Sequence, residues 1–282
     1  MAKIKPTPSE VFTAQNQTSL IKVINSLWGM QIDTITQDRV IRALELQGLP
    51  NEWLNELTQN IDFFIDNQMT PTMLGKTDLA GSTLVDLIDE GLDVGLAYTP
   101  GSNAITFVNG EMNILINNLK DPLNNNVTNT LRNAIDNNWS ITEVKQAMSP
   151  AMTLTEIQDN AYTAFKGRLS NDLTDKQKAK LADNYFKKLQ NERSERIART
   201  ELTRVKHFGE IDALNQNIQT GIISRATKIW NRSNYKDNWE SSIINDGVEV
   251  GINEGFPEPC ATGNDMYPSE INEYCYLDYN VI

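Results

Sequence analysis

The residue types that most often carry out catalysis are few in this chain of 282 residues. His207 is the sole histidine, so every acid–base scheme that uses an imidazole would depend on it. On a helical wheel His207 lies far from the centre of the apolar stripe of its segment, which predicts a histidine at the surface. The sequence has no P-loop, no G-x-G-x-x-G segment and no nucleophile elbow. We therefore expect a protein that is not an enzyme and binds no cofactor.

Metal coordination finds equally little support. Cys260 and Cys275 are the only cysteines, whereas zinc sites are built from clustered cysteine and histidine ligands. The carboxylates are numerous, but no local spacing singles out a catalytic pair. No apolar stretch approaches the roughly 20 residues needed to cross a bilayer, so we expect synthesis in a reducing cytoplasm with both thiols free. A bridge between them would require that the protein later leaves that compartment.

One carboxylate is conspicuous by its position. The segment "RSERIARTELTRVKHFGE", residues 193–210, has helical periodicity, and its apolar stripe consists of Ile197, Ala198, Leu202, Val205 and Phe208. Glu201 falls inside this stripe, where a carboxylate is costly to bury without a partner. We expect Glu201 to accept hydrogen bonds from the C-terminal part of the chain, from backbone N–H groups or the Trp230 indole, with Arg204 adding charge balance. Arg199, about 160° away on the wheel, is expected to contact another segment or subunit.

The charge is unevenly distributed along the chain. The net charge is −12, but residues 166–206 carry twelve Lys and Arg against six Asp and Glu, so the remainder sums to −18. An acidic chain repels nucleic acid, so we expect weak DNA contact or none. The candidates for contact with phosphate or with an acidic protein partner are Lys176, Lys180, Lys187, Lys188, Arg193 and Arg196. The alternative is a solvated helix with mixed-sign pairs. Tyr185 and Phe186 extend the apolar periodicity and are expected to face the core.

Helical patterns dominate the first 220 residues. Periodicity predicts helices over about residues 11–28 and in "TITQDRVIRALELQGLP", "NEWLNELTQNIDFFIDNQM" and "STLVDLIDEGLDVGLAY". Capping boxes are predicted at Ser140 and at Thr153, and Thr174 is the expected cap of a helical segment that runs, with or without a break, from about residue 175 to about residue 217. The Asn-Gly pair in "VNGE", residues 108–111, is typical of a hairpin turn.

Segments compatible with β-strands follow Gly221. "ISRATKIWN", "DGVEVGI" and "EYCYLDYNVI" have strand character, and a Pro/Gly-rich loop lies among them. Residues 1–10 are expected to form an extended polar arm. We predict an α+β fold, with a predominantly α-helical body and a small β-rich C-terminal lobe. A helical N-terminal region would cover residues 1–135, and a second region, residues 136–282, would contain helices over 140–217 and the lobe over 222–282.

The order of motifs in residues 140–282 resembles a known family. "RIARTEL" is followed by a glycine-terminated turn, then by "KIWN", "INDGVEV", "NEGF", a Pro-rich loop and "NEYCYLDY". This order is similar to that of the phage Mu F-like minor head proteins, also called head morphogenesis proteins, of tailed double-stranded DNA phages. The matching residues are Ala198, Arg199, Thr200, Glu201, Trp230, Asp246, Gly247, Phe256 and Cys275. The chain departs from the family at Ser242, where histidine is usual, and at Leu277, where a second cysteine is usual, which argues against a metal or thiol role.

The resemblance implies a structural virion protein rather than an enzyme. It would be a minor head protein, located in the head or at the portal vertex, made in the host cytoplasm, and active in head morphogenesis, DNA packaging or ejection. Its implied partners are the portal protein, other capsid proteins and further copies of itself, with no membrane contact. Two alternatives stay open: a head–tail connector or neck ring protein, and a hydrolase or transferase built on the C-terminal domain.

Overall fold

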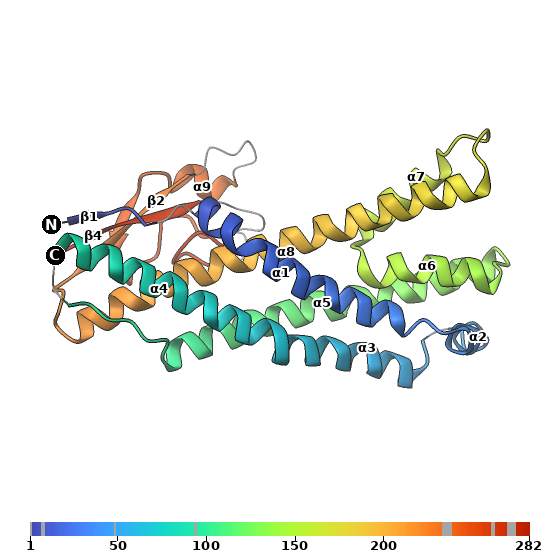
Figure 1. Ribbon diagram of the computed structural model, residues 1–282, viewed down its shortest axis with the longest axis horizontal. Coiled ribbons are helices and arrows are strands. Elements are labelled where there is room, and N and C mark those ends of the chain that lie inside the picture. The colour runs from blue at the N-terminus through green and yellow to red at the C-terminus, as the bar shows by residue number, and fades with distance from the viewer. Residues whose placement is uncertain are drawn as a thin grey trace. The chain divides into compact units, whose positions relative to one another are not determined.

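The computed structural model describes residues 2–6, 9–47, 49–92, 95–232, 239–260, 263–269 and 275–282 (Figure 1). Its helices are α1 (Ser9–Asp33), α2 (Gln37–Glu45), α3 (Asn51–Phe64), the π-helix η1 (Ile65–Met69), α4 (Thr70–Leu92), α5 (Ser102–Asp136), α6 (Ile141–Thr153), α7 (Glu156–Gly167), α8 (Asp175–Gln219) and α9 (Glu240–Ile244). Its strands are β1 (Ala2–Ile4), β2 (Ala226–Asn231), β3 (Glu249–Gly251) and β4 (Tyr276–Val281). The fold is α+β, mainly helical with a small sheet built largely from C-terminal strands, as predicted.

The chain forms two compact units, and each is assembled from separate stretches of sequence. Unit 1 consists of Met1–Leu20, Met69–Glu111 and Arg196–Ile282, and unit 2 of Ile21–Gln68 and Met112–Glu195. The boundary expected between residues 135 and 136 falls inside unit 2. Helices α1, α5 and α8 each contribute residues to both units. Sequence order conceals this arrangement, because each unit draws on segments that are far apart in the chain.

Unit 1 contains a four-stranded antiparallel sheet with the strand order β1-β4-β2-β3. The central strands β2 and β4 are in a register that pairs Ala226 with Val281 and Trp230 with Leu277. The N-terminal arm, expected only to be extended, supplies the edge strand β1, which pairs with β4 (Figure 1). β3, from the segment "DGVEVGI" in which strand character was expected, pairs with β2 on the other side. Strands from both ends of the sequence thus lie side by side in one sheet.

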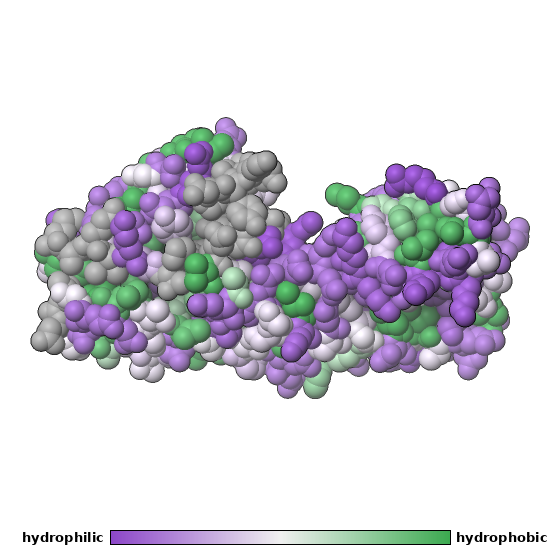
Figure 2. Space-filling view, turned by 45° about the horizontal axis from the view of Figure 1, so that its top comes forward, coloured by the Kyte–Doolittle hydropathy of each residue, from purple (hydrophilic) through white to green (hydrophobic). Residues whose placement is uncertain are grey.

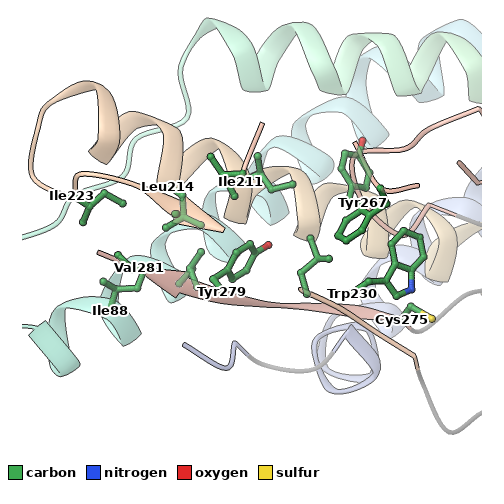
Figure 3. Close-up of a cluster of buried hydrophobic side chains, with 14 of the residues drawn as sticks. Ile88, Ile211, Leu214, Ile223, Trp230, Tyr267, Cys275, Tyr279 and Val281 are labelled. Atoms are coloured by element: carbon green, nitrogen blue, oxygen red, sulfur yellow. The ribbon is translucent and has the colours of Figure 1, made fainter. Parts of the chain in front are cut away.

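The core of unit 1 lies between this sheet and helices α4 and α8 (Figure 3). Its buried side chains include Ile88 of α4, Ile211 and Leu214 of α8, and Tyr279 and Val281 of β4. Residues along β2 alternate between buried and half-buried, as expected of a strand with one face on a core. Each large apolar side chain buried in this way contributes about 1.5–3 kcal/mol to stability.

Unit 2 is helical in its described residues, and aromatic side chains join its helices. Trp28 Nε1 of α1 donates to Ser194 Oγ of α8 at 2.8 Å. Near its start, α8 packs on α7 through Tyr185 and Phe165, whose ring centroids are 4.3 Å apart. Phe186 also packs against an aromatic ring of α7. Tyr185 and Phe186 are half-buried against α7, which agrees with the expectation that they pack inward.

The helix boundaries follow the predicted caps in two of three cases. Ser140 begins α6 with a complete capping box, and Thr174 caps α8, which runs to Gln219 as a single helix. The capping box predicted at Thr153 is wrong. Thr153 is the last residue of α6, and Thr155 caps α7 instead. The two threonines are two residues apart, and only the second has the extended backbone that a cap requires.

The hairpin turn predicted in "VNGE" is wrong, because residues 108–111 lie inside α5. Buried residues recur along α5 at helical spacing: Ala104, Val108, Met112, Leu115 and Leu119. Burial of this stripe outweighs the local preference of Asn-Gly for a turn, since a glycine inside a helix costs only about 1 kcal/mol. The tertiary environment therefore decides the conformation of this segment.

The close approach of α8 to α4 in unit 1 gives the first prediction. A Cβ on Gly209 would overlap the Thr77 carbonyl oxygen and lie 3.3 Å from the Ala80 Cβ. Because a backbone oxygen of a packed helix cannot move aside without moving the helix, Gly209→Ala should lower the free energy of unfolding by at least about 2 kcal/mol. Urea unfolding followed by circular dichroism measures this change.

Gly75→Ala on α4 is the matched control, since a Cβ there would meet no atom within 4 Å. Because alanine favours the helix, this variant should be neutral or more stable by up to about 1 kcal/mol. Equal unfolding midpoints for the two variants would contradict the packing of α8 on α4.

Candidate functional site

The segment of α8 from Thr200 to Leu214 is buried at every residue except Phe208, which is half-buried. Most helices of soluble proteins keep one polar face in water, so burial on all sides is unusual for a segment this polar. Its buried ionisable residues are Glu201, Arg204, Lys206, His207, Glu210 and Asp212. A buried charge is costly unless it is paired and hydrogen-bonded, so the contacts of these groups define the site.

Arg204 connects α8 to two other parts of unit 1. Its Nη1 donates to Glu111 Oε2 of α5 at 2.9 Å and to Glu201 Oε1 at 3.5 Å. Its Nε and Nη2 both donate to the carbonyl oxygen of Ser269, at 3.3 and 3.2 Å. One guanidinium therefore joins α5, α8 and the C-terminal segment that precedes β4.

Three consecutive carbonyl groups of that segment each accept a side-chain donor, and we call this arrangement the carbonyl anchor (residues 267–269). Tyr267 O accepts from Cys260 Sγ at 3.7 Å and from an asparagine amide at 3.4 Å. Pro268 O lies 3.0 Å from His207 Nδ1, and Ser269 O accepts from Arg204. The anchor docks an irregular segment onto α8 without a helix or strand.

His207 was predicted at the surface, and this prediction is wrong. The side chain is fully buried, and its Nδ1–H donates to Pro268 O. Burial lowers the pKa of His207 well below its usual value, and the neighbouring Lys206 lowers it further. The wheel failed because it assumes one buried face, whereas this part of α8 is covered on all sides.

Glu201 is buried, and its partner is on its own helix. Its Oε1 accepts from Arg204, and its Oε2 has no hydrogen-bond partner among the residues that the structure describes. The Trp230 indole also has none there, and no backbone N–H of the described C-terminal residues donates to Glu201, so the prediction of donors from the lobe is wrong for the described residues. The predicted charge balance by Arg204 is confirmed. Burial raises the pKa of Glu201 to about 7, against the lowering effect of Arg204.

A second buried pair, missed by the sequence analysis, lies one turn further along α8. Lys206 Nζ donates to Glu210 Oε1 at 2.7 Å, and Tyr279 of β4 donates its hydroxyl to Glu210 Oε2 at 3.1 Å. Lys206 and Glu210 have the (i, i+4) spacing of a helical ion pair, which was the available signal. The pair fastens the centre of the sheet to α8.

Lys228 of β2 is buried as well, after Arg204 and Lys206, and its burial was not predicted from the sequence. Its Nζ donates to Ile252 O at 3.1 Å and lies 5.4 Å from the centre of the Phe256 ring. Burial lowers the pKa of Lys228 to about 8, opposed by Asp265 and then by Glu254. These contacts hold the loop after β3 against the sheet.

The other residues of the family-like motifs make packing and backbone contacts. The Trp230 and Phe256 rings meet edge to face at 5.0 Å, and Cys275 is buried in the same apolar cluster (Figure 3). Gly247 has φ +77°, a left-handed conformation that suits glycine, and its N–H donates to Trp230 O at 2.8 Å. Asp246 accepts from the backbone N–H that follows β2 at 2.9 Å.

Three further motif residues lie on α8, at the start of this segment and just before it. Thr200 is buried and its Oγ1 donates to Arg196 O at 2.9 Å. Arg199 is half-buried. Ala198 is fully buried, as its place in the apolar stripe predicts. The "ARTE" motif is thus mostly internal to unit 1.

The six candidate cations for partner contact do not form one surface. Lys176, Lys180, Lys188 and Arg196 are exposed, and so is Lys187, which pairs with Asp183 at 2.8 Å. Lys188 lies 3.7 Å from Glu192. Lys187 and Lys188 thus take part in mixed-sign pairs, as the alternative interpretation expects, and both side chains stay exposed to a partner.

Arg193 is half-buried in unit 2 and its side chain makes internal contacts, which do not favour its predicted role as a contact residue. Its guanidinium lies 4.8 Å from the centre of the Trp28 ring, and its Nη1 donates to Thr153 O at 2.8 Å. Burial lowers the pKa of Arg193 to about 10. The side chain is therefore committed to packing α8 against α1 and α6.

Among the described residues, no three or more His, Cys, Asp or Glu side chains gather in a way that could hold a metal ion. Cys260 and Cys275 are both buried, and no disulfide joins them in the structure. The described helices include none that combines the length and apolar character needed to cross a membrane. Comparison with family models, curated proteins and solved structures finds no match to the chain.

Removal of the Arg204 guanidinium gives the second prediction. Arg204→Met keeps the length of the side chain but leaves two buried carboxylates and Ser269 O without their shared donor. Breaking a buried ion pair on one side costs about 3–5 kcal/mol, so the free energy of unfolding in urea should fall by that amount. Arg196→Met, at an exposed position of the same helix, should change it by less than about 0.5 kcal/mol. A loss below 1 kcal/mol for Arg204→Met would show that the anchor contributes little.

Proposed function

We propose that this chain is a structural virion protein of a tailed double-stranded DNA phage, a minor head protein that binds the portal vertex. In this role it assists head morphogenesis, DNA packaging or ejection and performs no chemistry of its own. The proposal starts from the family resemblance of residues 140–282. It gains support from the contacts that the motif residues make with one another.

The observation that carries the proposal is that motifs far apart in sequence meet in unit 1. Gly247 donates its N–H to Trp230 O, and Phe256 packs on the Trp230 ring at 5.0 Å. Cys275 belongs to the same buried cluster. A chance succession of short motifs has no reason to produce such contacts. Their convergence is what a shared fold would require.

The two departures from the family also fit a structural role. Leu277, at the position of the second cysteine, is fully buried in the apolar cluster. Ser242, at the position of the histidine, is buried on α9. The aliphatic side chain of Leu277 packs well but cannot bind a metal or act as a thiol. Leucine at this position therefore fits a role in the fold and not a metal-binding or thiol role.

A protein of this kind needs an exposed surface for its partner, and unit 2 offers one on α8. Lys176, Lys180 and Lys187 lie within about 40° of one another on the helical wheel, roughly opposite the buried Ala182 and Leu189. This lysine face suits an acidic protein surface. In Figure 2, the end of the view where α6 and α7 lie carries hydrophilic and hydrophobic side chains together.

The third prediction reverses the lysine face. The triple variant Lys176→Glu, Lys180→Glu and Lys187→Glu should reduce capture of the portal protein encoded beside this gene at least tenfold in a pull-down. Capture by the parent protein should weaken as salt rises, because exposed charges are screened. Point changes are preferable to deletion of residues 1–135, since that deletion removes parts of both units.

The matched control reverses three exposed cations elsewhere: Arg132→Glu, Lys145→Glu and Arg225→Glu. It changes the net charge equally and should leave capture unchanged. Equal losses in both triple variants would show that only net charge matters. Failure of the parent protein to bind the portal protein would remove the proposed role.

A further inference from the structure

Two buried carboxylates in unit 1 share one guanidinium. Glu111 Oε2 and Glu201 Oε1 lie 2.9 and 3.5 Å from Arg204 Nη1. The three side chains are at most 16% exposed. Glu201 Oε2 has no hydrogen-bond partner among the described residues. If both carboxylates were ionised, one buried positive charge would face two negative ones.

We propose that Glu111, Glu201 and Arg204 form a proton-operated latch, in which protonated Glu201 keeps the carbonyl anchor docked on α8 and loss of that proton releases it. In the docked state Glu201 is a neutral acid, and Arg204 is balanced by Glu111. The remaining N–H groups of Arg204 then hold Ser269 O. When Glu201 ionises, its proton leaves to solvent, and a second carboxylate competes for the same guanidinium.

The other ionisable groups near Glu201 leave this competition in place. Lys206, on the next turn of α8, is paired at 2.7 Å with a carboxylate one turn further on. His207 is held neutral by burial, which lowers its pKa, and it donates to the anchor. From the C-terminal segment Tyr267 faces the same region, and burial raises its pKa so that it stays a neutral phenol. Arg204 is thus the cation that pairs with Glu201 among these groups.

The direction of the pH effect follows from the burial of Glu201. Burial raises the pKa of Glu201 to about 7 from the usual 4.5, Arg204 opposes the shift and Glu111 adds to it. A proton held more tightly in the docked state than in the open state stabilises docking. This stabilisation is fully present below about pH 4.5 and decreases as the pH rises from there to about 7. Above about pH 7 it is lost, and stability no longer changes with the ionisation of Glu201.

The chain contains its own reporter of undocking. Cys260 is buried, and its Sγ donates to Tyr267 O, the first carbonyl of the anchor. Release of the anchor frees this thiol and opens it to reagents. Cys275, after the anchor, is buried in the apolar core and serves as an internal comparison within the same molecule.

The test measures the rate at which 4,4′-dithiodipyridine labels Cys260 between pH 5 and 8.5. The rate in the parent protein is compared with the rate in Glu201→Gln, and mass spectrometry identifies the labelled cysteine. Glutamine keeps the shape of a neutral acid and does not titrate. Thiol ionisation cancels in the ratio of the two rates. We expect this ratio to rise about tenfold per pH unit between pH 5 and 7 and to level off above. Glu90→Gln, at an exposed position of α4, should follow the parent protein at every pH.

A second variant tests the latch without changing Glu201 itself. Glu111→Gln removes the competing charge, so the pH at which Cys260 labelling levels off should move to lower values. Labelling ratios that do not change with pH would overturn the latch. Equal labelling of Cys260 and Cys275, at the rate expected from the free energy of global unfolding in urea, would also overturn the latch. Both thiols would then react only when the whole unit unfolds, and the anchor would not open separately.

Discussion

Arg204 is the side chain on which the interior of unit 1 depends. It contacts α5 through Glu111, its own helix through Glu201, and the C-terminal segment through Ser269 O. A guanidinium can do this because its N–H groups point in fixed, separate directions within one plane. The same geometry creates the constraint. With two carboxylates on one cation, the site is satisfied only if a proton accompanies them.

Burial of charge along α8 follows a simple pattern that limits its cost. Each cation is paired first on its own helix, at (i, i+3) for Glu201 and Arg204 and at (i, i+4) for Lys206 and Glu210. One member of each pair also bonds to other elements: Arg204 donates to Glu111 of α5 and to the anchor, and Glu210 accepts from Tyr279 of β4. Local pairing makes burial tolerable, and the second contact fixes where the sheet and the anchor lie against the helix.

The sequence predicted the features whose causes are local. The cap at Ser140, the length of α8 and the strands after Gly221 follow from capping chemistry and periodicity. Features that depend on distant segments were missed: the Asn-Gly pair inside α5, the strand at the N-terminus and the burial of His207. A wheel or a turn motif considers one segment at a time, whereas the covering of α8 on all sides depends on α4, α5 and the sheet together.

The candidate site divides in the same way. Glu201 could be identified from sequence, because a carboxylate in an apolar stripe violates a local pattern. Its partner Arg204 could be predicted as well, from the (i, i+3) spacing. The other groups that share Arg204 could not, since Glu111 and Ser269 are remote in sequence and no rule of spacing relates them to α8. Residues of the "ARTE" motif therefore mainly make internal contacts. Ala198 is fully buried, Thr200 donates to a carbonyl of its own helix, and Glu201 accepts from Arg204. Motifs of this kind specify a fold, and the residues that specify a partner must then be sought where side chains face solvent, as they do on the lysine face of α8.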